Sequence, residues 1–421
     1  YIFLACIMIL ITYTVEADVL SQFLQPESQC AANVSIDRNG RIATLVIDQN
    51  AAGVLVFNPD LTLKFNRRFS SSRTFTPSSI AATEDGGFVV VGAIELPSGD
   101  TDAIVFKMSS TGNILWKRIF GTAENDELHS VTILQDGSIA VLGHRISTST
   151  SYDLLIARLS KGGALLWKKA LGTPDLDHAS TITSVNGPAL IVSAGTGTSP
   201  VFPLWIKLSL GGTVLSARAG TTPEFAGIFY MDNPNGGYYL GSLGPHVQGQ
   251  LSKTNISRFD TTDRLLWSKS YGLSGSSMFL GHGFVNADGS LVMVGNASTN
   301  PSFTLKGVVM KISKSGGVQW KRTLNVPLST FSGTVLQTDG RIFTAGCVGW
   351  NTQASDMVTL SLPLSGNSAG CSSLTSAPIS ATATLLALRD FPIAVLPATF
   401  RNQTAAIQAA TAQSEKTALC P

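Results

Sequence analysis

The sequence predicts an all-β fold built from seven similar units, and three observations support this prediction. A phrase with an aromatic residue recurs along the chain, with Trp116 and Trp167 51 positions apart. Seven Asn-Gly or Asp-Gly pairs follow the same period, and such pairs supply the positive φ angles that tight hairpin turns need. The segments between these markers lack the apolar spacing of three and four residues that helices show.

Each unit divides into four short strands. In one repeat, residues 76–94 form a hairpin around the Asp85-Gly86 turn, and residues 102–121 form a second hairpin. Four-stranded units repeated without helices are typical of a β-propeller. We therefore expect a seven-bladed β-propeller, with four antiparallel strands per blade, over residues 18–364.

The aromatic position of the repeat is expected to hold the blades together. Because a large residue recurs there, we expect it to pack between neighbouring blades. Its successive occupants are Phe65, Trp116, Trp167, Ser216, Trp267 and Trp320. The turn pairs are Asn39-Gly40, Asp85-Gly86, Asp136-Gly137, Asn186-Gly187, Asn235-Gly236, Asp288-Gly289 and Asp339-Gly340.

The two ends of the repeat region are expected to meet in the last blade. Strands at residues 340–348 and 356–363 are followed by no good partner, whereas residues 19–24 precede the first repeat as an outer strand would. We expect 19–24 to supply the missing strand, which would leave no open sheet edge between blades. Residues 372–384 are the competing donor.

Composition and the N-terminal segment favour a secreted or cell-surface protein. Hydrophobic residues make up 44% of the chain and the formal net charge is +2, which excludes a disordered chain and predicts no nucleic-acid partner. Residues 1–17 are typical of a signal peptide ending at Ala17, and their apolar run is too short for a membrane span, so we expect none in the mature chain. Acceptor sequons, which predict a glycoprotein in a eukaryotic source, begin at Asn33, Asn255, Asn296 and Asn402.

Four cysteines remain outside the signal segment. An even number in an oxidising compartment predicts two disulfides. Three pairings are possible, and the sequence does not select one. The candidates are Cys30, Cys347, Cys371 and Cys420.

The phrases DGGFVVVG, DAIVFKMSSTGNILWKRIFG and DGSIAVLG resemble the propeller repeats of secreted and surface proteins of bacteria and protists. More distantly, they are similar to the Trp-docking repeats of quinoprotein dehydrogenases. The resemblance covers about residues 31–363 and implies the fold but no single activity. Lys107, Met108 and Ser109 stand where the quinoprotein pattern has Ala and Asp, so the resemblance implies no quinone cofactor.

Basic residues recur at two repeat positions and have two interpretations. They could form a cationic girdle for sulfated or acidic polysaccharide, or they could block edge-to-edge association of outer strands. The near-neutral net charge favours the second interpretation. They are Arg67, Arg118, Lys169, Arg218, Lys269 and Arg322 after the aromatic position, and Lys107, Arg158, Lys207, Arg258 and Lys311 on the preceding strand.

Carboxylates recur in the loops that join successive blades and predict a ligand site at one mouth of the ring. Such oxygens suit Ca²⁺, which takes six to eight oxygen ligands, or an acid pair for glycoside hydrolysis. Alternatively, each carboxylate caps its own turn, and recurrence with the repeat favours capping. The candidates are Glu124, Asp126, Asp175, Asp177 and Glu224, with His129 and His178 beside them, and the calcium candidates are Glu124, Asp126, Asp175 and Asp177.

Other sequence features add little chemistry. No His-Glu-x-x-His, Cys-x-x-Cys or Gly-x-Ser-x-Gly motif occurs, so no catalytic residue is predicted. Trp350 lies outside the packing position and is a candidate either for stacking on a sugar or a protein, or for fastening its own loop.

Residues 365–421 break the repeat. Ser, Thr and Ala make up 27 of these 57 residues, and residues 391–400 carry two prolines. These features predict an extended tail laid on the propeller or donated to a neighbouring subunit.

Together, these features predict a secreted or cell-surface propeller that acts as a non-enzymatic binding or structural module. Its ligand would be a glycan or a protein at the loop face. The alternative is a polysaccharide-acting enzyme, a glycosidase or a lyase, that uses the acidic residues at the mouth. The oligomeric state is left open.

Overall fold

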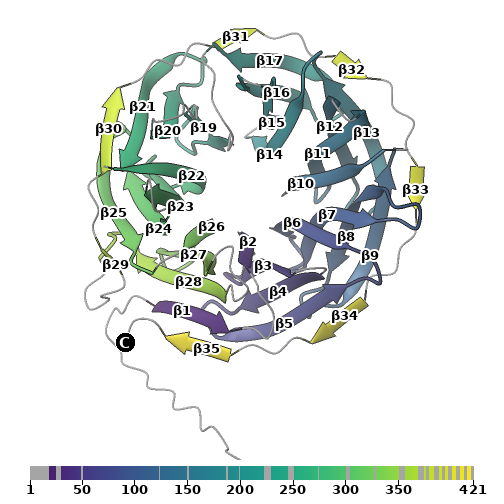
Figure 1. The fold of residues 1–421 in the computed structure, drawn as a ribbon, viewed down its shortest axis with the longest axis horizontal. Helices are drawn as coiled ribbons and strands as arrows, with labels where there is room; N and C mark the ends of the chain where they lie inside the picture. Colours follow the sequence, from purple (N-terminus) through teal and green to yellow (C-terminus); the bar gives the residue numbers. More distant parts are fainter. Residues whose placement is uncertain are drawn as a thin grey trace, which may run out of the picture.

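The chain forms an all-β ring in the computed structural model. Every described element is a strand, and paired strands run antiparallel. Figure 1 shows the strands arranged around a central axis. The structure describes residues 19–24, 30–48, 51–122, 124–148, 151–185, 188–198, 200–221, 229–244, 251–273, 275–299, 304–326, 329–349, 356–367, 374–375, 379–383, 388–390, 394–396, 401–403, 408–411 and 415–418.

Twenty-eight strands build the ring itself. They are β1 (Val19–Leu24), β2 (Cys30–Ile36), β3 (Ile42–Asp48), β4 (Ala51–Phe57), β5 (Leu63–Ser70), β6 (Phe75–Ala82), β7 (Phe88–Glu95), β8 (Thr101–Met108), β9 (Ile114–Gly121), β10 (Asp126–Ile133), β11 (Ile139–Thr148), β12 (Ser151–Leu159), β13 (Leu165–Gly172), β14 (Asp177–Val185), β15 (Ala189–Thr196), β16 (Phe202–Ser209), β17 (Val214–Gly220), β18 (Phe229–Asp232), β19 (Tyr238–Leu243), β20 (Thr254–Phe259), β21 (Leu265–Leu273), β22 (Ser276–Val285), β23 (Leu291–Thr299), β24 (Thr304–Ile312), β25 (Val318–Leu324), β26 (Thr330–Leu336), β27 (Arg341–Val348) and β28 (Asp356–Pro363).

Hydrogen bonding groups these strands into six sheets, not the seven separate blades that the sequence predicts. Runs of four strands recur as expected, and we call each run a unit: β2–β5, β6–β9, β10–β13, β14–β17, β18–β21, β22–β25, and β26–β28 with β1. The units β18–β21 and β22–β25 belong to one sheet, because β21 and β22 are so close in sequence that Leu273 pairs with Ser276.

The two faces of the ring differ in their connections. The turns that join the first strand to the second, and the third to the fourth, lie on one face, which we call the turn face. The connections between the second and third strands, and those between successive units, lie on the other face, which we call the loop face. This division follows from the antiparallel order of four strands in each unit.

The N-terminal strand completes the last unit, as predicted. β1 pairs with β28, with Val19 opposite Ser361 and Phe23 opposite Met357. A disulfide between Cys30 of β2 and Cys347 of β27 joins the same two units, with Cα atoms 4.9 Å apart. Cys371 and Cys420, like the signal segment 1–17, lie outside the described residues.

The C-terminal tail supplies seven short strands, each paired with the outermost strand of one unit. They follow the ring in the direction opposite to the chain order of the units (Figure 1). We call them the belt: β29 (Leu374–Thr375) on β25, β30 (Ile379–Ala383) on β21, β31 (Leu388–Asp390) on β17, β32 (Ala394–Leu396) on β13, β33 (Arg401–Gln403) on β9, β34 (Gln408–Thr411) on β5 and β35 (Glu415–Ala418) on β1. The competing donor, 372–384, thus pairs elsewhere than on β28.

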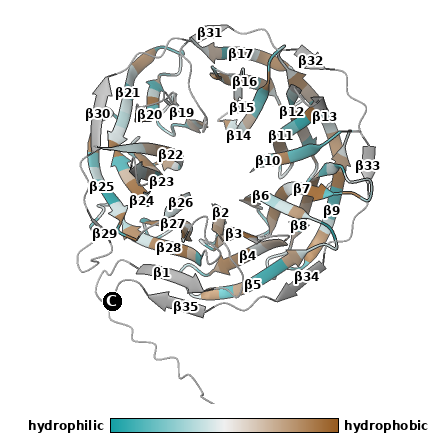
Figure 2. Cartoon of the chain, in the orientation of Figure 1, coloured by the Kyte–Doolittle hydropathy of each residue, from teal (hydrophilic) through white to brown (hydrophobic). Residues whose placement is uncertain are grey.

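The core lies between neighbouring units. One cluster joins β3 and β4 to β7 and β8 through buried residues such as Val54, Phe88 and Phe106. Another joins the units β10–β13 and β14–β17. Figure 2 shows hydrophobic segments distributed around the whole ring. Burial of each unit therefore depends on its neighbours, as the hydrophobic effect requires of thin sheets.

The aromatic repeat position packs between units, as predicted. The indole N–H of Trp167 donates to the carbonyl of Leu210 in the next unit's turn at 2.8 Å, and Trp267 donates likewise to Lys314 at 2.9 Å. The Trp167 ring covers Gly212, the positive-φ residue of that turn. These two indoles are thus partly buried and hydrogen-bonded, an arrangement that suits a large aromatic with a polar group.

Recurring basic residues also serve the ring. On third strands, Lys107 pairs with Asp85 at 2.5 Å and Arg158 with Asp136 at 2.6 Å. On outer strands, Arg118 donates to the carbonyl of Gly163 in the next unit at 2.7 Å. The two ion pairs lie within a unit and the Arg118 bond joins neighbouring units, so edge protection is not needed to explain these side chains.

Candidate functional site

The predicted carboxylates Asp126 and Asp177 occupy equivalent places at the start of β10 and β14, where the chain enters each unit from the loop face. Both are fully buried. Thr122 donates its hydroxyl to Asp126 at 2.8 Å, and Thr173 donates its backbone N–H to Asp177 at 2.6 Å. Each aspartate therefore caps its own turn. This is the role that the recurrence of the carboxylates with the repeat favours.

Burial affects the protonation of Asp177. Removal from water disfavours the charged carboxylate and raises its pKa to about 6, although hydrogen bonds from Thr173 and Thr196 oppose this effect. Glu124 and Asp175 follow the two capping threonines and are exposed. Glu224 and Trp350 lie outside the described residues, so the structure adds nothing about them.

The predicted histidines belong to a cluster that the carboxylate pattern did not reveal. His129 lies at a β-bulge of β10, between Leu128 and Ser130, and its ring meets His144 of β11 with centroids 4.4 Å apart. Glu127 pairs with His144 across these strands. A bulge redirects one side chain out of the regular alternation, which is how His129 reaches its neighbours.

Hydrogen-bond distances tie three of these groups together. His129 Nε2 lies 3.0 Å from Glu127 Oε1 and 2.8 Å from His144 Nδ1, and His144 Nδ1 lies 3.3 Å from Glu127 Oε1. Hydrogen bonds from the two imidazoles hold the pKa of Glu127 well below its usual value. The glutamate is thus a carboxylate at neutral pH.

The cluster extends across the boundary between two units. The rings of His144 and His178 have centroids 6.1 Å apart, and Tyr152 lies 5.7 Å from His144 and 6.0 Å from His178. β10 and β14, which carry His129 and His178, are neighbours at the inner rim of the ring (Figure 1). We call Glu127, His129, His144, Tyr152 and His178 the histidine cluster; its five side chains are partly exposed.

One hydrogen bond sets the tautomer of His144. The backbone N–H of Ala179 donates to His144 Nε2, so this nitrogen carries no proton and the neutral ring is protonated at Nδ1. Burial lowers the pKa of His144, and the pKa of His178 is lowered by burial and by the nearby His144. Both rings are therefore neutral at physiological pH.

This tautomer bears on metal binding. Glu127, His129 and His144 place ligand atoms close enough together to share an ion. A proton on Nδ1 of His144 would occupy the lone pair that the ion needs, leaving two ligands where zinc sites have three or four from protein. Within the described part of the chain, the calcium candidates Glu124, Asp126, Asp175 and Asp177 are not among the side chains grouped closely enough for a cation.

Sequence reasoning placed His129 and His178 at this mouth but missed Glu127, His144 and Tyr152. His129 carries a usable signal. The bulged residues at the equivalent position of other first strands are Ala32, Ser78, Ser180, Gly281 and Ser332, all small. A histidine in a series of small residues marks a departure from the scaffold.

Comparisons with known proteins give only distant structural likenesses. No protein-family model and no curated protein matches the chain. Among solved structures, a protein of unknown function from Dyadobacter fermentans is 10% identical, with a TM-score of 0.47 over 82% of this chain and 98% of that one. The NanB sialidase from Streptococcus pneumoniae is 6% identical, with a TM-score of 0.47 over 83% and 95%.

A third structure is larger than this chain. Prolyl oligopeptidase B from Galerina marginata is 10% identical, with a TM-score of 0.49, and the match covers 88% of this chain and 52% of that one. With TM-scores below 0.5 and identities of 6–10%, these likenesses carry no argument about fold or activity. Among the described residues, no helix is long and apolar enough to cross a membrane.

Proposed function

We propose that this protein is a secreted or cell-surface, seven-bladed β-propeller that acts as a non-enzymatic binding module, with a glycan or protein ligand at the loop face. The units β18–β21 and β22–β25 count as two blades in this proposal, because only one residue pair joins them. The Cys30–Cys347 disulfide is compatible with an oxidising compartment.

One observation carries the binding role. Asp126 and Asp177, the two predicted carboxylates that are buried at the mouth, are each committed to a turn by threonine hydrogen bonds. A glycosidase needs two carboxyl groups free to reach the scissile bond. The partly exposed histidine cluster instead offers imidazole and phenol surfaces with hydrogen-bonding edges, which suit contact with a sugar or a peptide.

The test reverts His129 to the residue type of its repeat position. We expect the wild-type protein to bind a defined set of structures on a glycan array, and His129→Ser to lose them while its thermal unfolding midpoint stays unchanged. Ser180→Ala, at the equivalent bulge of β14, serves as the matched control and should keep binding. Binding that survives His129→Ser would place the ligand elsewhere.

A second candidate function is supported by the contacts of Glu127 Oε1 with His129 Nε2 and His144 Nδ1. A carboxylate held by two imidazoles suits general acid–base chemistry, for example proton abstraction by a polysaccharide lyase. Acidic polysaccharides incubated with the protein would then yield unsaturated products absorbing in the ultraviolet, and His129→Ser would abolish them. Binding without product formation favours the module.

A further inference from the structure

We propose a second ligand site on the turn face, between the units β14–β17 and β18–β21, that takes a sugar ring carrying an anionic group. This inference does not depend on the loop-face proposal. It rests on three departures from the repeat that meet at one junction.

The first departure is Ser216, which replaces the aromatic residue. At the junctions of Phe65, Trp116, Trp167 and Trp320, that aromatic ring covers a glycine of the next unit. A Cβ built on Gly163 would come within 2.7 Å of the Trp116 ring, and one on Gly212 within 3.1 Å of the Trp167 ring. Ser216 cannot fill the equivalent space, so the junction after β17 is left open.

The second departure is Asp263, which replaces the covered glycine. Gly163, Gly212 and Asp263 donate the same kind of hydrogen bond, from their N–H to the carbonyl three residues earlier, so they hold equivalent turn positions. All three have positive φ, 81°, 80° and 62° respectively. A non-glycine residue in this region is uncommon and strained, and such strain is concentrated at functional sites.

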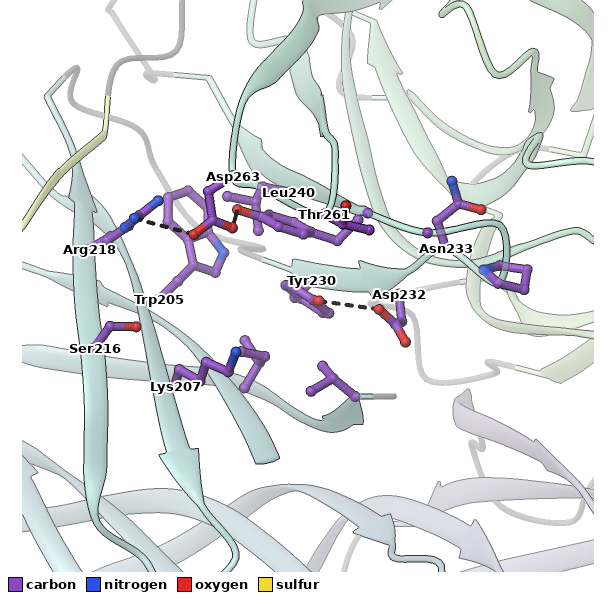
Figure 3. A pocket seen from close by; sticks show the side chains of 16 residues that line it. Trp205, Lys207, Ser216, Arg218, Tyr230, Asp232, Asn233, Leu240, Thr261 and Asp263 are labelled. Carbon is purple, nitrogen blue, oxygen red and sulfur yellow. Dashed lines mark hydrogen bonds and ion pairs between the residues drawn. The ribbon is translucent and has the colours of Figure 1, made fainter. Parts of the chain in front are cut away.

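Together these two changes open a cavity of about 390 Å³ (Figure 3). Its size is at the lower end of the range for small-molecule pockets. Tyr230 and Tyr238 form part of its wall, with ring centroids 5.1 Å apart and planes 22° from parallel. Burial raises the pKa of both phenols, so they remain hydrogen-bond donors. Tyr238 is stacked between Tyr230 and Phe259, so the face of Tyr230 turned away from Tyr238 is the one left for the apolar face of a sugar ring.

Polar groups line the same cavity. Asp263 accepts a hydrogen bond from the Tyr238 hydroxyl at 2.9 Å and pairs with Arg218 at 3.3 Å. Trp205 is 6% exposed, and its indole N–H has no acceptor among the described residues. A buried donor without a partner destabilises the protein. A ligand oxygen or a water molecule would remove that destabilisation.

The third departure leaves a cation in the cavity wall. Lys107, Arg158 and Lys311 each pair with an aspartate of their own unit's first turn. Lys207 holds the equivalent position, but the sequence has Asn186 in place of that aspartate. No carboxylate in the described part of the chain lies within ion-pair distance of Lys207, which lines the cavity. Its ammonium is therefore available for an anionic group.

The ligand class follows from these groups. The face of Tyr230 turned away from Tyr238 suits a flat apolar surface, Asp232 and Asp263 offer acceptors for hydroxyls, and Lys207 offers a cation for a carboxylate or sulfate. A uronic acid or a sulfated sugar combines these features in one ring. The site could accept it free or as part of a chain.

The test is isothermal titration calorimetry with sodium glucuronate, glucose and acetate. We expect glucuronate to bind at least tenfold more tightly than glucose or acetate, since it combines a hydrogen bond to a charged group with contacts to the ring. Lys207→Gln should remove the preference for glucuronate over glucose. Asn186→Asp, which restores the repeat's aspartate, should do the same.

A double variant tests the cavity itself. Ser216→Trp with Asp263→Gly rebuilds the filled junction of the other units, so we expect it to fold and to bind none of the three compounds. Glucuronate binding by this variant, or no glucuronate binding by the wild type, would overturn the site. Equal affinity for glucose would overturn the anionic class, and equal affinity for acetate would overturn the sugar. A longer acidic oligosaccharide that binds more tightly than glucuronate would identify the chain form as the ligand.

Discussion

Two junctions on the turn face show how one scaffold can be either filled or open. At the junction after β13, the Trp167 ring covers Gly212, and the cluster between the two units contains fifteen buried apolar residues. At the junction after β17, Ser216 faces Asp263 across a cavity, and the described cluster contains only Trp205, Leu240 and Phe259 as buried members. The comparison teaches that the ring tolerates one weak junction because its neighbours remain filled.

The pairing of residue types at these junctions is consistent around the ring. Of the turn positions with positive φ before an outer strand, Leu61 and Asp263 are not glycine. Asp263 lies in the unit next to the one that contains Ser216. Leu61 lies in the unit next to the one in which strand register places Val19 at the aromatic position. At both positions, a residue with a side chain replaces the turn glycine where the preceding unit has no aromatic ring to cover it. Leu61 packs against an apolar cluster, whereas Asp263 lines a polar cavity.

The largest expected effect comes from opening a filled junction. Trp167→Ser should lower the free energy of unfolding by about 3 kcal/mol, because it removes a large, partly buried ring and its hydrogen bond to Leu210. Ser216→Ala, at the same repeat position, should change it by less than about 0.5 kcal/mol. Urea denaturation measures both. Equal losses in the two variants would show that the junctions do not differ.

A smaller effect is expected when the glycine of the filled junction is replaced. Gly212→Asp should destabilise the protein by about 2 kcal/mol, because the residue has a φ of 80° and its Cβ would lie 3.1 Å from the Trp167 ring. Asp263→Gly relieves a strained φ but removes the contacts with Arg218 and Tyr238, so its net change should be under about 1 kcal/mol. Thermal unfolding of the two variants compares them; a Gly212→Asp protein as stable as the wild type would contradict the covered-glycine interpretation.

The smallest effect concerns the charge pair that the open junction lacks. Burial alone would raise the pKa of Asp85, but hydrogen bonds from Lys107, Thr83 and Gly87 outweigh it and hold the pKa at about 2. The unfolded carboxyl titrates near pH 3.9, so this contribution is complete above about pH 4 and is lost as the pH falls toward 2. Because the Asp85 side chain is 55% exposed, we expect less than about 1 kcal/mol.

Denaturation at pH 5 and pH 2.5 tests this pair. Asp85→Asn should reduce the difference in stability between the two pH values, whereas Lys207→Gln, which removes a cation without an aspartate partner, should leave the difference unchanged. A larger pH effect in Lys207→Gln than in Asp85→Asn would contradict the assignment of the partnered and unpartnered lysines.

The features that could be predicted from the sequence are those formed by residue types that recur once in every repeat. The hairpin turns, the strands they join and the docking of Trp167 recur once per unit, so repetition made them visible. The partner of β28 was predictable because residues 19–24 hold an outer-strand place ahead of the first repeat.

Features that depend on register and on departures from the repeat were harder to predict. Glu127 meets His144 across two strands, and Ala179 reaches His144 from the next unit, neither of which a sequence period reveals. Ser216 was visible as an exception to the aromatic series, but its meaning required Asp263 beside it. The belt was also beyond prediction as such, because strands of two to five residues carry almost no pattern.

The belt has a mechanical consequence. Ser21 pairs with Ala418, 397 positions away, so closing this contact carries a large chain-entropy cost and belongs to the slow steps of folding. From β29 to β34, each belt strand pairs one unit further back along the chain, and β35 then pairs with β1. A pulling force on the C-terminal end would therefore peel β35 first and β29 last. Each step would break only two to five residue pairs, so the belt would unzip at low force while the ring beneath it stayed intact.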